Sequence, residues 1–298
     1  MHRTRTGKRI ELTERDIEIF KLLSRYRYLR STYIYAFVGG ASVTRFKERL
    51  GDLFHEGYLD RPAKQWEFAD ARHMPVVHES GRAAEKALRA CGMALEGPNT
   101  FLAGSPHRQF LHSLMICEAL ASLDLGIRAK PFLRFIGWSE ILGRAPEATR
   151  LSPTPFRFPV PFGGYLVPDG LFGIEYVSGG TMTYRFFALE ADRGTMPVSR
   201  SNPNQTSYLG KLAAYREVMD RQVHKSHLGI PNLLVLTLTT GEARMKEMLT
   251  RLAGQAGNHA AFLFKAIRDD AQRTPMPQLL TEPWQRAGFA PLRIGKPD

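Results

Sequence analysis

The segment Ser42–Gly57 reads SVTRFKERLGDLFHEG and has the spacing of one amphipathic helix. Ser42 is a favourable N-cap residue, because its hydroxyl accepts a hydrogen bond from an otherwise unpaired backbone N–H. Four apolar residues then recur at intervals of three or four, which places them on one buried face: Val43, Phe46, Leu50 and Leu53. Gly57 favours the end of the helix. We therefore predict a helix between these two residues.

The flanking sequence predicts a winged helix-turn-helix around this segment. A first helix follows Thr13, which has Asp16 three residues later as a capping partner, and a second covers Ser31–Phe37 before the turn Gly39-Gly40. Short strands are expected at residues 58–60, 65–68 and 75–78, and a closing helix at 81–90. Three helices, a β-hairpin and a closing helix form a winged helix-turn-helix, whose third helix enters the major groove of DNA.

The remaining sequence predicts a second domain of α/β type. Residues 92–105 are rich in Gly, Pro, Asn and Ser and are expected to be a linker. Beyond it, helices are expected at 106–125, 205–220 and 242–253, a loop at 143–163, and strands at 132–139, 165–177, 184–192, 232–239 and 260–265. The predicted class is α+β: a winged-helix domain over 1–91, and an α/β domain with a central mixed sheet over 106–298.

Composition and charge favour a polyanionic partner. The 298 residues carry a formal net charge of +12, and residues 1–50 hold seven more basic than acidic side chains. The two cysteines, Cys91 and Cys117, are too few for a disulfide framework or a four-cysteine zinc site. No apolar run approaches the roughly 18 residues of a membrane span, and no apolar segment of a secretory signal follows the basic N-terminus. We expect a cytoplasmic protein associated with the nucleoid or a plasmid, without membrane or small-molecule partners.

Double-stranded DNA is the predicted partner, and the candidate contacts come from three segments. The third helix offers Arg and Lys side chains to base edges and phosphates, the wing reaches a neighbouring groove, and the N-terminal arm lies along the minor groove. The candidate DNA-binding residues are Arg3, Arg5, Lys8, Arg9, Thr44, Arg45, Lys47, Arg49, Arg61, Lys64, Arg72 and His73.

Acidic side chains in the second domain suggest a catalytic site. Glu190 and Asp192 alternate on one strand, Asp169 lies in another, and Glu118 interrupts the apolar stripe of a helix. Their order resembles the PD-(D/E)xK nucleases, in which acidic residues hold a divalent metal for phosphodiester cleavage. The resemblance implies catalytic roles for Glu118, Asp169 and Glu190, with Asp169 and Glu190 as ligands of Mg²⁺. The lysine expected two residues after Glu190 is Asp192, so Lys211 on the following helix would have to replace it.

A structural interpretation of the same residues stands beside the catalytic one. Glu190-Ala-Asp-Arg193 is then an ion-pair and turn motif, in which Lys211 or Arg193 pairs with Glu190 or Asp192. No cofactor is needed on this interpretation, and DNA cleavage is absent.

A longer series of segments resembles the bacterial replication-relaxation family. It comprises Leu12-Thr-Glu-Arg-Asp16, the winged helix, His107-Arg108, Pro168-Asp-Gly170, Leu189-Glu-Ala-Asp-Arg-Gly-Thr195 and Lys211-Leu-Ala-Ala-Tyr215. The resemblance covers about residues 10–240, and nothing is recognised from Gly241 onward. It implies a winged-helix DNA-binding protein that serves the replication, relaxation or transfer of a plasmid or other mobile element.

Two functions are compatible with these patterns. The first is a non-catalytic, sequence-specific regulator or accessory factor that binds double-stranded DNA as a homodimer. The second is a Mg²⁺-dependent endonuclease or nickase that its winged helix directs to DNA. Asp192 at the lysine position favours the first.

Overall fold

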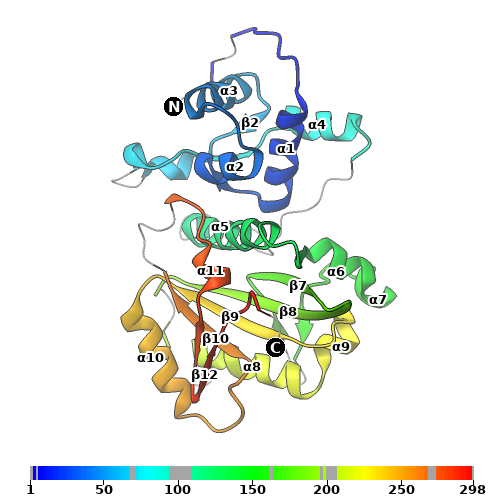
Figure 1. Ribbon diagram of the computed structural model, residues 1–298, viewed down its shortest axis with the longest axis vertical. Coiled ribbons are helices and arrows are strands. Elements are labelled where there is room, and N and C mark those ends of the chain that lie inside the picture. Colours follow the sequence, from blue (N-terminus) through cyan, green and yellow to red (C-terminus); the bar gives the residue numbers. More distant parts are fainter. Residues whose placement is uncertain are drawn as a thin grey trace. The chain divides into compact units, whose positions relative to one another are not determined.

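The computed structural model describes residues 3–4, 6–67, 71–93, 109–160, 164–194, 197–198, 207–267 and 273–296. The fold is α+β, with helices toward the N-terminus and a mixed sheet toward the C-terminus, as the sequence predicted (Figure 1). The chain divides into two compact units. The N-terminal unit comprises residues 1–125 and 271–276, and the C-terminal unit comprises 126–270 and 277–298.

The N-terminal unit begins with three helices whose starts follow their caps. They are α1 (Glu14–Tyr26), α2 (Ser31–Val38) and α3 (Val43–His55). Thr13 and Asp16 form the expected capping box of α1, and the Ser42 hydroxyl accepts the Arg45 N–H, 3.3 Å away, at the start of α3. The apolar stripes of these helices are buried, with Ile19, Phe20 and Leu53 at 0% exposure.

A small antiparallel sheet and a further helix complete this part of the unit. The strands lie in the order β1 (Leu29–Arg30), β3 (Val77–Ser80), β2 (Leu59–Asp60), and α4 (Arg82–Ala90) follows. The strand expected at 65–68 is wrong, because residues 63–67 form a short 3₁₀ helix. The buried amide of Gln65 accepts the Val77 N–H and donates to the Val77 carbonyl, so a side chain makes the contacts expected of a backbone strand.

Helix α5 (Gln109–Arg128) is more apolar than the sequence analysis recognised. Its Phe110–Arg128 stretch is long and apolar enough to cross a membrane by length and composition. However, 78% of that window is buried inside the structure, as in the core helix of a globular fold. The statement that no stretch approaches the length of a span is therefore corrected, and the stretch has the burial of a core helix.

The C-terminal unit is built on one mixed sheet. Its described strands lie in the order β12 (Phe289–Leu292), β11 (Trp284–Arg286), β10 (Phe262–Ala266), β9 (Leu234–Thr239), β8 (Thr181–Asp192), β7 (Gly170–Ser178), β4 (Leu133–Ile136). The β8–β9 and β9–β10 pairs are parallel, and the other pairs are antiparallel. β7 and β8 form a hairpin through Gly179-Gly180, both of which have positive φ, the conformation a tight hairpin turn requires.

Helices α8 (Tyr208–Asp220) and α10 (Glu242–Ala253) pack against these strands, and α9 (Val223–Leu228) and α11 (Gln278–Thr281) are shorter (Figure 1). The loop expected at 143–163 is wrong in part, because it holds the end of α6 (Trp138–Arg144), α7 (Glu147–Arg150) and β5 (Phe158–Pro159). The single extended run expected at 165–177 is divided into β6 (Tyr165–Leu166), which pairs with β5, and β7.

The domain bounds expected from the sequence remain predictions. Residues 94–108, where most of the expected linker lies, are outside the described residues. The compact units place α5 up to Leu125 in the N-terminal unit, whereas the sequence analysis began the second domain at residue 106.

Candidate functional site

Asp169 and Glu190 are brought together by the β7–β8 hairpin. Asp169 directly precedes β7, and Gly170 pairs with Leu189 of β8, so Asp169 and Glu190 lie side by side on neighbouring strands. The Asp169 Oδ2 atom accepts the Ala191 N–H at 2.9 Å. Both side chains are in the interior, with residue exposures of 7% and 4%. Two carboxyl groups buried this closely require compensation, since they would otherwise repel each other.

Helix α8 supplies the compensation. Lys211 and Tyr215 lie one turn apart, at i and i+4, and both reach Glu190. The Lys211 ammonium donates to Glu190 Oε2, and the Tyr215 hydroxyl donates to Glu190 Oε1. Lys211 Nζ also lies 3.8 Å from Asp169 Oδ1. We call Asp169, Glu190, Lys211 and Tyr215 the Glu190 cluster.

The charges of the Glu190 cluster are strongly coupled. Burial raises the pKa of Glu190 to about 8, and the negative charge of Asp169 adds to this, although Lys211 opposes it. Burial alone would lower the pKa of Lys211, but the charges of Glu190 and Asp169 raise it above its usual value. Lys211 is therefore a cation at neutral pH, and Asp169 together with one shared proton on Glu190 leaves the cluster close to neutral.

Asp192 has its own cation and stays outside the Glu190 cluster. Arg244 of α10 donates to both carboxylate oxygens, at 3.3 and 3.1 Å, and the Gly194 N–H donates to Oδ1 at 2.6 Å. The sequence analysis proposed Arg193 for this role, so the source of the cation was wrong. Arg244 carried no signal in the sequence, because only the parallel pairing of β8 with β9 brings the start of α10 to the end of β8.

Glu118 is in the N-terminal unit and pairs there with Arg30. The Arg30 guanidinium donates to Glu118 Oε2, and the side-chain exposures of Arg30 and Glu118 are 6% and 0%. Burial raises the pKa of Glu118 to about 7, although Arg30 opposes this rise. The structure thus brings together Asp169, Glu190 and Lys211, and gives Glu118 a separate ion pair.

The Glu190 cluster does not fit a divalent metal in this arrangement. Both oxygens of Glu190 accept hydrogen bonds from side chains, and Asp169 Oδ2 accepts one from the backbone. The Lys211 ammonium occupies the position between the carboxyl groups that a cation shared by them would take. Among the described residues, no three Asp, Glu, His or Cys side chains are grouped as metal ligands. Mg²⁺ needs several free oxygen ligands, so we derive no metal-dependent step here.

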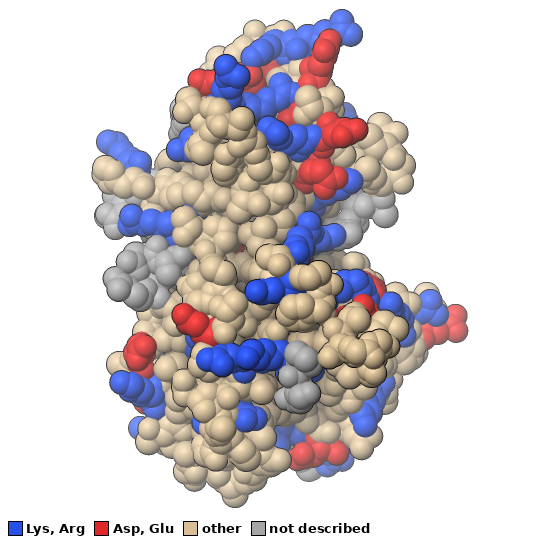
Figure 2. All heavy atoms as spheres, in the orientation of Figure 1, with Lys and Arg blue, Asp and Glu red and all other residues tan. Residues whose placement is uncertain are grey.

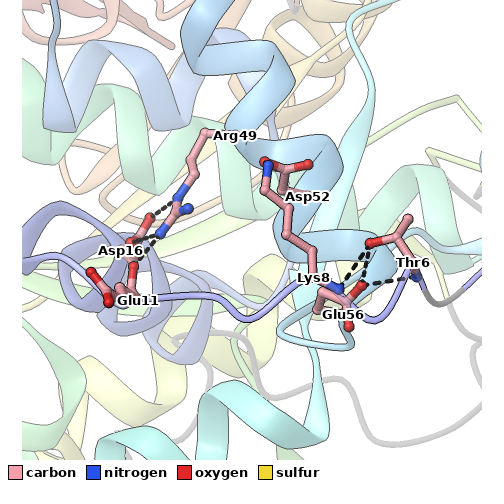
Figure 3. Close-up of polar contacts among 7 residues, drawn as sticks. All are labelled: Thr6, Lys8, Glu11, Asp16, Arg49, Asp52 and Glu56. Atoms are coloured by element: carbon pink, nitrogen blue, oxygen red, sulfur yellow. Dashed lines mark hydrogen bonds and ion pairs between the residues drawn. The ribbon is translucent and has the colours of Figure 1, made fainter.

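The second candidate site is the surface of α3, where Arg49 holds the fold together. Its guanidinium donates to both oxygens of Asp16, at 3.1 and 2.6 Å, and to the Glu11 carbonyl at 2.7 Å (Figure 3). Burial would raise the pKa of Asp16, but the hydrogen bonds from Arg49 and Thr13 hold it below its ordinary value. Arg49 therefore joins α3 to the N-terminus of α1, and its guanidinium is directed away from the role of reading bases.

The N-terminal arm lies on α3 and β2 through several polar contacts. Lys8 pairs with Asp52 at 2.5 Å, and Thr6 donates to Glu56 through both its backbone N–H and its hydroxyl (Figure 3). Arg3 donates to the carbonyls of Phe54 and Leu59 and pairs with Asp60. Arg5 is outside the described residues, and Arg9 is exposed. The arm expected in a minor groove is thus held here by the acids of α3 and β2.

Few of the predicted DNA-binding residues remain on an open surface. Thr44, Arg45 and Lys47 are exposed along α3, and Arg72 and His73 are exposed before β3. The guanidinium of Arg61 lies 4.2 Å from the centroid of the Phe54 ring, and Lys64 is half-buried. On the face drawn in Figure 2, basic and acidic side chains are interspersed over the described part of the N-terminal unit. The basic surplus of residues 1–50 is therefore partly neutralised by neighbouring acids.

Comparison with known proteins gives a family. No curated protein and no solved structure matches the chain significantly. The model of the replication-relaxation family matches residues 20–234, a range that includes α3, the β7–β8 hairpin and the Glu190 cluster. This range is well over half of the 298 residues. The chain belongs to the replication-relaxation family.

Proposed function

We propose that the chain binds double-stranded DNA through α3, as a winged-helix protein. The order of elements in the N-terminal unit supports this: α1, β1, α2, α3, β2, β3, α4, with β1 on the far side of β3. A winged helix has this order, and its third helix reads the major groove. The β2–β3 connection, which includes Arg72 and His73, corresponds to the wing.

The exposed N-terminal half of α3 is the observation that carries the proposal. Thr44, Arg45 and Lys47 lie within one turn of each other and are exposed, whereas Arg49, Lys8 and Arg3 are paired with acids of the same unit. The structure records no ion pair for Arg45 or Lys47 among the described residues. Arg donates two hydrogen bonds to guanine edges, and Lys or Thr binds phosphates, so this half of α3 has the chemistry of a DNA-reading surface.

We further propose a non-catalytic role in the replication or relaxation of a mobile element. The family supports the setting, and the neutralised Glu190 cluster supports the absence of cleavage. A cytoplasmic homodimer on paired half-sites is the form we expect, because symmetric operators match the symmetry of dimeric helix-turn-helix proteins. The stoichiometry of the complex with DNA tests the dimer.

Arg45→Ala is expected to weaken duplex binding by roughly 1–3 kcal/mol if Arg45 contacts a base. Fluorescence anisotropy with fragmented DNA of the source organism selects a binding duplex and then measures its affinity. Lys246→Ala is the matched control, since it removes one exposed positive charge from α10 in the other unit. Equal affinities of Arg45→Ala and Lys246→Ala, or no wild-type binding at low salt, would contradict the proposal.

Arg49→Ala separates stability from recognition. Because Arg49 holds Asp16 and the Glu11 carbonyl, its loss lowers the melting temperature, whereas loss of the exposed Arg45 leaves the melting temperature unchanged. Thermal unfolding of both variants is therefore measured beside the affinities.

A metal-dependent nickase is the second candidate, favoured by the convergence of Asp169, Glu190 and Lys211. We expect no nicking of supercoiled plasmid by the wild type in Mg²⁺ or Mn²⁺, because the lysine and tyrosine engage the oxygens a metal would need. Glu190→Gln is the informative variant, since it keeps the size and one acceptor oxygen of the side chain. Metal-dependent nicking by wild type that is lost in Glu190→Gln would establish the nickase instead.

A further inference from the structure

The β5–β6 hairpin of the C-terminal unit has one buried face and one exposed face. Phe158 pairs with Leu166, and Pro159 pairs with Tyr165. Phe158 and Leu166 are 0% and 3% exposed, so they anchor the hairpin in the core. Side chains alternate between faces along a strand, which places Arg157, Pro159 and Tyr165 together on the outer face. All three are exposed.

Tyr165 presents its ring to solvent to an unusual degree. It is 67% exposed, against 44% for Phe289 and 41% for Phe132. The Arg157 guanidinium carbon lies 5.7 Å from the centroid of the Tyr165 ring, within the range of a cation–π contact. An anchored hairpin thus holds an aromatic ring and a guanidinium beside each other on the surface.

His227 ties further cations to this hairpin. Its ring lies 5.7 Å from that of Phe158, and its Nε2 atom is 2.8 Å from the Pro155 carbonyl. The Thr149 hydroxyl donates to the His227 carbonyl. Arg150 next to Thr149, and Lys225 two residues before His227, are both exposed. With Arg157 they give three cations around Tyr165, against one exposed acid, Glu147, on α7.

We infer that the outer face of the β5–β6 hairpin binds single-stranded DNA, with an unpaired base stacked on Tyr165 and the backbone phosphates near Arg150, Arg157 and Lys225. An exposed aromatic ring among cations is the combination that binds single strands without sequence readout. A duplex offers no free base face to the ring, and the positive balance of the patch disfavours an acid-poor protein partner. The choice of DNA over RNA rests on the proposed function, whereas the site itself is in the other unit.

The test compares affinities for a labelled dT oligonucleotide by anisotropy at low salt. Tyr165→Ala is expected to weaken binding at least about fivefold, and Tyr165→Phe to retain it, because stacking needs the ring and not the hydroxyl. Phe289→Ala is the matched control. That ring also lies beside an arginine, but the Arg286 guanidinium donates to the carbonyls of Ala290 and Ala260. Phe289→Ala is expected to bind dT as the wild type does.

Salt dependence gives a second readout. Arg157→Gln is expected to lower the slope of log affinity against log salt by about 0.7, the value for one phosphate contact on a single strand. Equal dT affinities of wild type and Tyr165→Ala, or no dT binding by the wild type, would overturn the inference. Tighter binding of an rU oligonucleotide, equally sensitive to Tyr165→Ala, would overturn the choice of DNA.

The two proposals fail separately. Arg45→Ala is expected to weaken duplex binding and leave dT binding unchanged, and Tyr165→Ala is expected to do the reverse. A wild type that binds dT through Tyr165 but binds no duplex refutes the role of α3 alone. Both side chains are exposed, so unchanged melting temperatures of the variants establish that the effects arise in binding.

Discussion

Glu190→Ala is expected to lower the free energy of unfolding by roughly 3–5 kcal/mol, the cost of removing one partner from a buried charged pair. The substitution leaves the Lys211 ammonium with only the more distant Asp169, and it leaves the fully buried Tyr215 hydroxyl without its acceptor. Urea unfolding of wild type and variant measures the difference. A variant as stable as the wild type would mean that the Glu190 cluster is not structural.

Glu190→Gln is the matched control for this substitution. The pKa of Glu190 is raised to about 8, so the side chain is largely protonated at neutral pH, and a glutamine closely mimics that form. Its carbonyl accepts from Lys211 and its amide group bonds the Tyr215 oxygen. We therefore expect Glu190→Gln to cost much less than Glu190→Ala at pH 7.

The pH dependence of stability follows from the same pKa. Between an unfolded pKa near 4.5 and the folded value of about 8, the folded chain binds more protons at Glu190 than the unfolded chain does. Stability contributed by this proton is present at low pH and is lost as the pH rises toward 8. Glu118, with a folded pKa of about 7, acts in the same direction. Glu190→Gln should flatten the decline above pH 7, and an identical curve for both proteins would contradict the assignment.

Local patterns predicted most elements, and the errors have identifiable causes. Helices α1, α3 and α10 were predicted because their caps and their 3.6-residue periodicity lie within a few neighbouring residues. The stretch 65–68 was misread because the buried side-chain amide of Gln65 replaces a strand, a contact that no periodicity reveals. Tyr165–Val177 was read as one strand because nothing in its apolar pattern marks the change of pairing partner from β5 to β8.

The candidate sites were predicted less well than the elements, because ion pairs join distant segments. Lys211 and Tyr215 were recognisable as a spaced pair on one helix face, and they do meet Glu190. Arg49 and Arg45 have the same spacing and equal charge, yet only Arg49 is taken up by Asp16, 33 residues away. Glu118 was assigned to the acidic site from its place in an apolar stripe, and its actual partner, Arg30, is 88 residues away. Burial of an acid was predictable, but the identity of its cation was not.

Arg30→Met is expected to lower the free energy of unfolding by roughly 3–5 kcal/mol, because it leaves Glu118 without its cation at 0% exposure. Urea unfolding at pH 5 and pH 8 should reveal a smaller loss at pH 5. At the lower pH Glu118 is protonated with or without Arg30, since its pKa is about 7 in the intact pair and rises further once the opposing cation is gone. At pH 8 the wild type keeps the ionised pair, and the variant must retain a proton or bury an unpaired charge.

The double variant Arg30→Met/Glu118→Leu decides whether the pair itself or the orphaned acid carries the cost. Apolar replacement of both partners of a buried pair is often neutral or stabilising, so the double variant is expected to recover most of the loss and its dependence on pH. Lys21→Met is the control in the same unit, because it breaks the exposed pair with Glu18 and should cost less than about 1 kcal/mol. If Arg30→Met left stability unchanged while Glu118→Gln abolished metal-dependent nicking, Glu118 would belong to a catalytic site. An unstable single variant rescued by the second substitution makes Glu118 a structural residue of the N-terminal unit.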